Sequence, residues 1–185
     1  MRALQRAIGR FFRHEDGSFV VESVLVLPML FWAHLGLFAY WNVYATTNTV
    51  QKATYTISDL ITRQQVSVDD AYLNGLRNVM SYLVESPTTP KIRVTSFRYS
   101  QANSRYEVIW SRSPSNAMSV LNNASLVSLR DRLPLMSDGD SAVLVETEVG
   151  FAPLLEFGIT MNKIEQFVVT RPRFLAKICH TSFSC

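Results

Sequence analysis

The stretch HEDGSFVVESVLVLPMLFWAHLGLFAYWNVY, residues 14–44, decides how this chain is built. No Asp, Glu, Lys or Arg occurs in residues 23–51, although charged residues make up 18% of the 185-residue chain. A helix of about 20 apolar residues crosses a hydrocarbon core of roughly 30 Å. Residues 24–44 supply a run of that length, so we expect one transmembrane helix here.

The composition of the run favours a membrane-spanning helix over a secretory signal that is cleaved off. Tyr40, Trp41 and Tyr44 stand at its far end, where amphipathic rings are enriched at membrane interfaces. Pro28 and Gly36 are compatible with a membrane helix, in which neighbouring groups satisfy the freed backbone. A secretory signal has a shorter apolar region of about 7–15 residues. The length of this run therefore disfavours a cleaved secretory signal.

The residues that flank the run predict its orientation. Basic residues keep the adjoining end of a span in the cytoplasm, and four precede this run: Arg2, Arg6, Arg10 and Arg13. We therefore expect residues 1–17 to be a basic cytoplasmic leader, 18–65 a transmembrane helix with its extension, and 66–185 a domain beyond the membrane. The formal net charge is +3, but no basic recognition helix with interleaved aromatic residues occurs, which argues against nucleic-acid binding.

Glu22 is the acidic residue at the start of the run. A carboxylate deep in lipid costs roughly 2.5–3.5 kcal/mol, so such acids usually have a partner or a function. One interpretation is a carboxylate at the rim of the membrane that reaches water. In the other, cleavage after Gly17 makes Ser18 the amino terminus, and Glu22 lies four residues on, one helical turn away. The new amine, of the same or a neighbouring chain, then pairs with the carboxylate.

The stretch FRHEDGSFVVESVLVLPML resembles the amino end of the TadE-like minor pilins, pseudopilin components of the tight-adherence (Flp-type, type IVb) pilus machinery. Gly17, Glu22, Leu27 and Pro28 match that family in order and spacing. The resemblance covers about the first third of the chain. Major Flp pilins are very short and typically have Tyr after the Glu, whereas Ser23 follows here and a large domain trails, which favours a minor component.

The resemblance implies a function in assembly or anchoring of the pilus. It also implies processing by a prepilin peptidase between Gly17 and Ser18. The other implied partners are pilins, minor pilins and the inner-membrane pilus platform proteins. The chain would sit in the bacterial inner membrane with a periplasmic domain. The alternative is a membrane-tethered periplasmic binding module or enzyme unrelated to pili.

Beyond the run, helical periodicity continues and then changes to the period of strands. One apolar stripe comprises Val50, Ala53, Ile57, Leu60 and Ile61. SVDD, with Ser67 as N-cap, predicts the start of a second helix with a stripe of Tyr72, Leu73, Leu76, Val79, Met80 and Leu83, which SPTTP ends.

Four stretches predict strands: KIRVTSFRY, YEVIW, AVLVETEVGF and QFVVTRPRF. Residues 119–133 predict a short helix between the second and third strands, ended by Pro134. The expected fold is α+β: a long amino-terminal helix that continues beyond the membrane, a second helix, and a small antiparallel sheet of about four strands.

No catalytic or cofactor-binding pattern accompanies these elements. The three histidines, His14, His34 and His180, are spread over the leader, the span and the carboxyl end. We therefore expect no enzyme, no catalytic residue and no cofactor. Glu146 and Glu148 face the same side of a strand, which suits a glycosidase or a cation site, but a solvated sheet face explains them with fewer assumptions.

Cys179 and Cys185 are the only cysteines. In an oxidising periplasm they are expected to form a disulfide, which would stabilise the domain by about 2 kcal/mol in the loop-entropy model. The alternative is a metal held by Cys179, His180 and Cys185, but this set supplies three ligands without a familiar spacing. We favour the disulfide and expect no metal.

Overall fold

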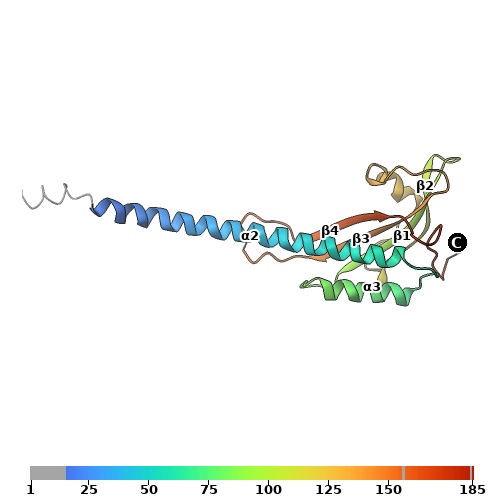
Figure 1. Cartoon of the computed structure of the whole chain (residues 1–185), viewed down its shortest axis with the longest axis horizontal. Helices are drawn as coiled ribbons and strands as arrows, with labels where there is room; N and C mark the ends of the chain where they lie inside the picture. Colours follow the sequence, from blue (N-terminus) through green and yellow to red (C-terminus); the bar gives the residue numbers. More distant parts are fainter. Residues whose placement is uncertain (1–15, 156, 184) are drawn as a thin grey trace, which may run out of the picture.

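A 47-residue helix and a four-stranded sheet dominate the structure, a computed structural model that describes residues 16–155, 157–183 and 185. Helix α2, Asp16–Thr62, extends as a rod from a domain that contains the second helix, α3 (Asp70–Leu83), and the sheet (Figure 1). This arrangement confirms the expected α+β fold. The leader predicted for residues 1–17 falls mostly outside the described residues.

Helix α2 buries residues mainly in its carboxyl half, apart from Ala39 near its middle. The residues Val50, Ala53, Ile57 and Ile61 are at most 3% exposed and face the domain core. Leu60, predicted for the same stripe, is 37% exposed, and the small polar residues Thr54 and Ser58 are buried instead. The stripe was therefore predicted correctly at four of five positions. The helix continues without interruption through Pro28.

Helix α3 begins two residues later than the sequence suggested. Its N-cap is Asp69, whose carboxylate accepts a hydrogen bond from the Tyr72 amide at 2.7 Å. Ser67 is not the cap because the chain beside it is extended. The amide of Val68 donates to the carbonyl of Cys179, and the amide of Thr181 donates to the carbonyl of Val68, both at 2.9 Å. The carboxyl end of the chain thus fixes where α3 starts.

The sheet is antiparallel throughout, with the strand order β2-β1-β3-β4. Its strands are β1 Lys91–Ser100, β2 Arg105–Arg112, β3 Ser141–Gly150 and β4 Lys163–Thr170. Strand β4 starts and ends earlier than predicted. Pro172 cannot donate to a ladder, and the amide of Arg173 instead donates to the carbonyl of Thr62 at the end of α2, at 2.9 Å.

Residues 119–133, predicted as one helix, form two shorter pieces. Helix α4 comprises Asn123–Ser128, and the 3-10 helix η2 comprises Arg130–Arg132. Asn122 caps α4, because its side chain accepts a hydrogen bond from the Ser125 amide at 2.9 Å. A further 3-10 turn, η1, comprises Pro114–Asn116.

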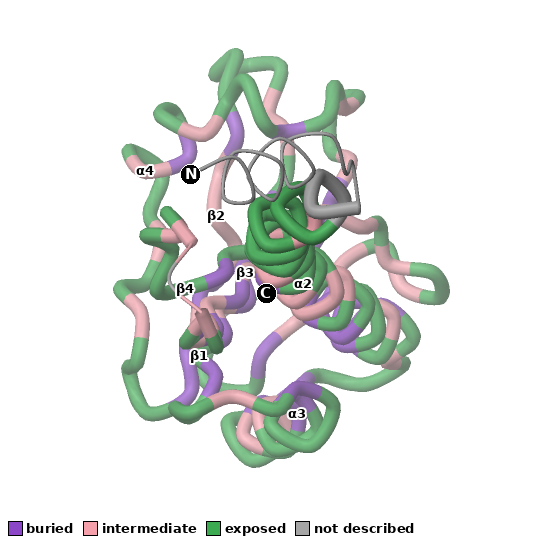
Figure 2. The backbone as a smooth tube through the Cα atoms, turned by 90° about the vertical axis from the view of Figure 1, so that its left-hand side faces the viewer, coloured by how far each residue is buried: buried purple, intermediate pink, exposed green. Residues whose placement is uncertain are grey.

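Apolar side chains pack on both faces of the sheet. Helices α2 and α3 cover one face, which presents Ile92, Val94, Val143 and Val145. Phe97 and Leu144 belong to a second cluster, with Leu126 of α4. Figure 2 looks along α2 and shows buried positions where α2, α3 and the strands meet, whereas the near end of the helix is exposed.

Candidate functional site

The amino-terminal half of α2 is an apolar surface that the other described residues leave exposed over most of its length. This helix is long and apolar enough to cross a membrane, and no residue in its most apolar 18-residue window is buried. Large apolar side chains project on all sides of it, including Leu25, Met29, Phe31, Trp32 and Leu37, each at least 63% exposed. A helix that is apolar all round is typical of a membrane span. We call residues 20–44 the rod.

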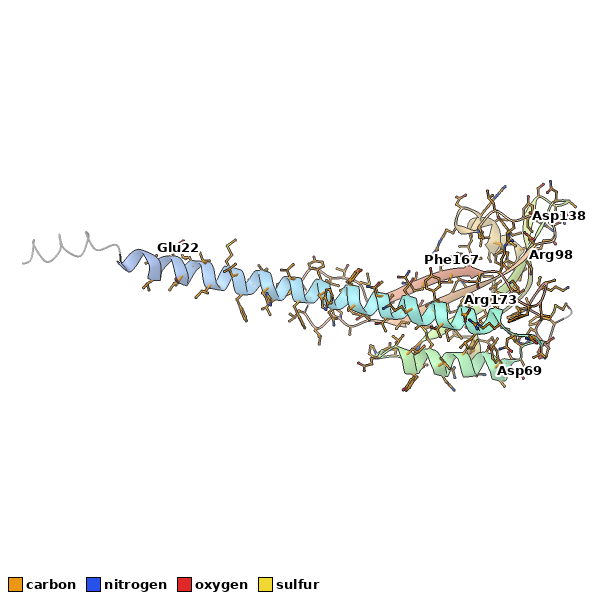
Figure 3. All side chains as sticks on the ribbon, viewed as in Figure 1. Glu22, Asp69, Arg98, Asp138, Phe167 and Arg173 are labelled. Carbon is orange, nitrogen blue, oxygen red and sulfur yellow. A yellow bond between two sulfur atoms is a disulfide. The ribbon has the colours of Figure 1, made fainter. Side chains whose placement is uncertain are left out.

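Glu22 lies on the exposed surface near the start of the rod. Figure 3 shows it far along the helix from Arg98 and Arg173, which belong to the domain at the other end. Gly17 and Ser18 lie in the first turn of α2, one turn before Glu22. Neither of these two cations therefore meets this carboxylate. Its pairing with an amine stays a prediction, as does cleavage between Gly17 and Ser18.

The connection between β3 and β4, residues 151–162, returns along α2 toward its amino end (Figure 1). The ring of Phe157 meets the ring of Trp32 edge-on, with centroids 4.8 Å apart. The hydroxyl of Tyr40 donates to the carbonyl of Phe157 at 3.5 Å. Gly36 faces the same ring, since a Cβ there would lie 3.8 Å from Phe157 Cδ1. We call residues 151–162 the return loop.

Cys179 and Cys185 form a disulfide with their Cα atoms 5.6 Å apart. Both sulfurs are bonded to each other, so neither is a thiolate that a metal could take up. Among the described residues, no group of three or more His, Cys, Asp or Glu side chains is arranged to hold a metal ion.

The disulfide holds a buried histidine against the start of α3. The His180 side chain is fully buried, and its Nε2 lies 3.5 Å from Oδ1 of Asp70. The rings of Trp110 and Phe183 flank it, with centroids 5.2 and 5.4 Å away. Burial lowers the pKa of His180 below its ordinary value of 6.5, and the carboxylate of Asp70 opposes that shift only in part. Sequence analysis missed this cluster because its members are far apart in the chain.

The two strand carboxylates, Glu146 and Glu148, are each paired with a cation from β1. Arg93 donates to both oxygens of Glu146 at 2.7 Å, and the two side chains are each only 13% exposed. Lys91 donates to Glu148 at 2.6 Å, and this hydrogen bond is the main reason that the pKa of Glu148 is lowered. The prediction of a solvated face was therefore wrong for Glu146, because Arg93 and its neighbours cover it.

Comparisons of the chain with protein-family models, with curated proteins and with solved structures found no match. The interpretation of the rod therefore depends on its own residues. Their arrangement is that of a long apolar helix with Glu22 near its amino end and a folded domain at its carboxyl end.

Proposed function

We propose that this chain is a minor pilin or pseudopilin of a tight-adherence (Flp, type IVb) pilus, which takes part in assembly or anchoring of the filament. The rod holds it in the inner membrane and packs side by side with the helices of other pilins. The observation that carries the proposal is the continuity of α2, whose exposed apolar half and domain-forming half are one helix.

The position of Glu22 supports this function more than a simple anchor. A tether needs no acidic residue on its apolar surface, and a carboxylate there is unfavourable unless it is paired or reaches water. Arg98 and Arg173 of the domain lie at the other end of the molecule (Figure 3). The partner in the proposal is the amine of Ser18, exposed when a prepilin peptidase removes residues 1–17, on this chain or on a neighbouring pilin.

The disulfide supports a periplasmic location for the domain. Disulfides persist in oxidising compartments such as the bacterial periplasm and are rare in the cytoplasm. The Cys179–Cys185 bond belongs to the domain, which follows the rod in the sequence, whereas the basic leader precedes it. The basic leader and the disulfide therefore support the same orientation of the chain in the membrane. The other partners proposed are the inner-membrane platform proteins, and no catalytic residue or cofactor is assigned.

Intact mass of the membrane-extracted chain tests the processing step. Coexpression with the cognate prepilin peptidase is expected to remove residues 1–17, and an inactive peptidase is expected to leave the full-length mass. The same mass in both preparations would contradict cleavage at Gly17.

Glu22→Gln tests the assembly role. The variant keeps the size of the side chain and removes its charge, so we expect surface pili to be lost while the protein level in the membrane is unchanged. Glu85→Gln, at an exposed position of the domain, is the matched control and is expected to leave piliation intact. Normal piliation with Glu22→Gln would favour the alternative, a tethered binding module or enzyme, in which the span is only an anchor.

A further inference from the structure

The part of α2 that precedes the return loop is shorter than a bilayer is thick. Before the apolar run the last charged residue other than Glu22 is Asp16, and the return loop contacts one side of the helix at Trp32, Gly36 and Tyr40. At 1.5 Å per residue, Asp16 and Trp32 are separated by about 24 Å along the axis. A typical hydrocarbon core is roughly 30 Å thick. A bilayer of ordinary thickness around the rod would therefore reach the level of the return loop.

The return loop has the composition of a surface that meets lipid. Leu154 and Met161 are 69% and 44% exposed, and Glu156 is the only ionisable residue in the loop. Phe157 lies against Trp32 of the rod itself, so the loop and the span form one continuous apolar surface. Such a surface is costly in water and favourable in acyl chains.

Charged side chains lie where the loop joins the sheet. Lys163 starts β4 immediately after the loop, and it pairs in register with Gly150. Lys163 and Lys91 are about half exposed and share the carboxylate of Glu148, at 3.4 and 2.6 Å. A boundary from apolar to charged residues is typical of the passage from acyl chains to headgroups, where lysine stems reach outward to water.

We infer that the return loop inserts its apolar side chains into the membrane leaflet on the domain's side, beside α2. Irregular backbone is unfavourable in the hydrocarbon centre, so the loop lies at the boundary between headgroups and acyl chains. The partner of this surface is lipid, and the contact fixes how deep the domain sits. This inference goes beyond the proposed function, because it needs only the span.

Spin labels on full-length protein in lipid vesicles test the insertion. Both native cysteines form the disulfide, so a single added cysteine takes the label. Leu154→Cys reports on the loop, and Val127→Cys on α4 is the matched control, with 69% and 64% exposure at the two positions. We expect collisions with oxygen, which concentrates in acyl chains, to exceed those with a water-soluble nickel chelate at position 154, and the reverse at position 127.

Two results would overturn the inference. If the nickel chelate reached position 154 as readily as position 127, the loop would lie in water. If both reagents were excluded from position 154, and dilution of the protein in lipid restored access, a second copy of the chain would cover the loop instead. Intact mass and circular dichroism of each labelled variant verify that the disulfide and the fold are retained.

Discussion

The two halves of α2 belong to the same helix and have different surroundings. The rod, residues 20–44, exposes large apolar side chains on all sides. The carboxyl half buries one stripe against the sheet, and small hydroxyl residues lie within that stripe. Thr54 shares a 2.8 Å hydrogen bond with Thr147 of β3, and Ser58 shares a 2.6 Å bond with Thr170 of β4.

This difference shows how one helix is specified for two environments. In the carboxyl half, the domain supplies the partners that each buried group needs, so that half is complete within the chain. In the rod, the return loop supplies the contacts at Trp32, Gly36 and Tyr40. The rest of the rod has little cover from the other residues that the structure describes. Matched substitutions in the two halves should therefore have different effects.

The largest difference is expected for apolar truncations. Ile57→Ala removes a fully buried side chain and is expected to lower the free energy of unfolding of the domain by about 2–5 kcal/mol. Leu25→Ala removes a side chain that is 70% exposed and is expected to change it by less than about 0.5 kcal/mol. Urea unfolding of the full chain in detergent micelles, followed by fluorescence and circular dichroism, measures both. Equal losses would show that the rod packs on the domain.

The disulfide is expected to act on the domain alone. Replacing Cys179 and Cys185 together by Ser should lower the free energy of unfolding by about 2 kcal/mol, because the unfolded chain is no longer constrained by the small ring. Reduction of the wild-type protein by dithiothreitol should give a similar loss and leave the double variant unaffected. A helical signal from the rod that fell with the domain would contradict the independence of the two regions.

Within the carboxyl half of α2, hydroxyl groups should matter on the buried face and not on the exposed face. Thr54→Val leaves the buried hydroxyl of Thr147 without its partner and is expected to cost roughly 1–2 kcal/mol. Thr49→Val is the matched control, because its exposed hydroxyl donates only to the carbonyl of Ala45 in the same helix. The same unfolding experiment measures both variants. If Thr49→Val lowered the free energy of unfolding as much as Thr54→Val, the exposed hydroxyl would matter as much as the buried one, contrary to this prediction.

The smallest expected effect is a dependence of the domain's stability on pH. Burial lowers the pKa of His180, so the unfolded chain binds a proton more readily than the folded domain, and stability falls as the pH drops below about 6.5. The free energy of unfolding at pH 5.5 is therefore expected to be lower than at pH 7.5. Glu148 has a lowered pKa and stays ionised in this window. His180→Gln should remove the dependence on pH, and a wild-type protein with equal stability at both values would contradict it.

The spacing of apolar residues predicted which helices and strands form, because in each of them the local apolar pattern matches the face that the fold buries or exposes. The apolar run predicted the rod, and the alternation of apolar residues predicted all four strands. Element ends were less predictable. Asp69 caps α3 because the carboxyl end of the chain pairs with Val68, and Pro172 and the contact of Arg173 with Thr62 end β4. These ends depend on residues more than 100 positions away.

The candidate site was predictable only where it is local. Gly17, Ser18 and Glu22 can be read from a short pattern, and their roles stay predictions. The contact of Phe157 with Trp32 joins residues on a loop and a helix that no periodicity relates. The pairing of Arg93 with Glu146 follows from strand register, which opposes these residues across β1 and β3. Sequence spacing carries no information on that register.

The absence of a linker between the rod and the domain couples their orientations. Helix α2 has 47 residues, which corresponds to about 70 Å. Spans tilt by about 20° on average, and over this length such a tilt displaces the far end sideways by about 24 Å. The domain cannot turn independently to compensate, because α2 is part of its core. The direction in which the domain points, and the neighbours that it can reach, are thus set by the angle of the helix in the membrane.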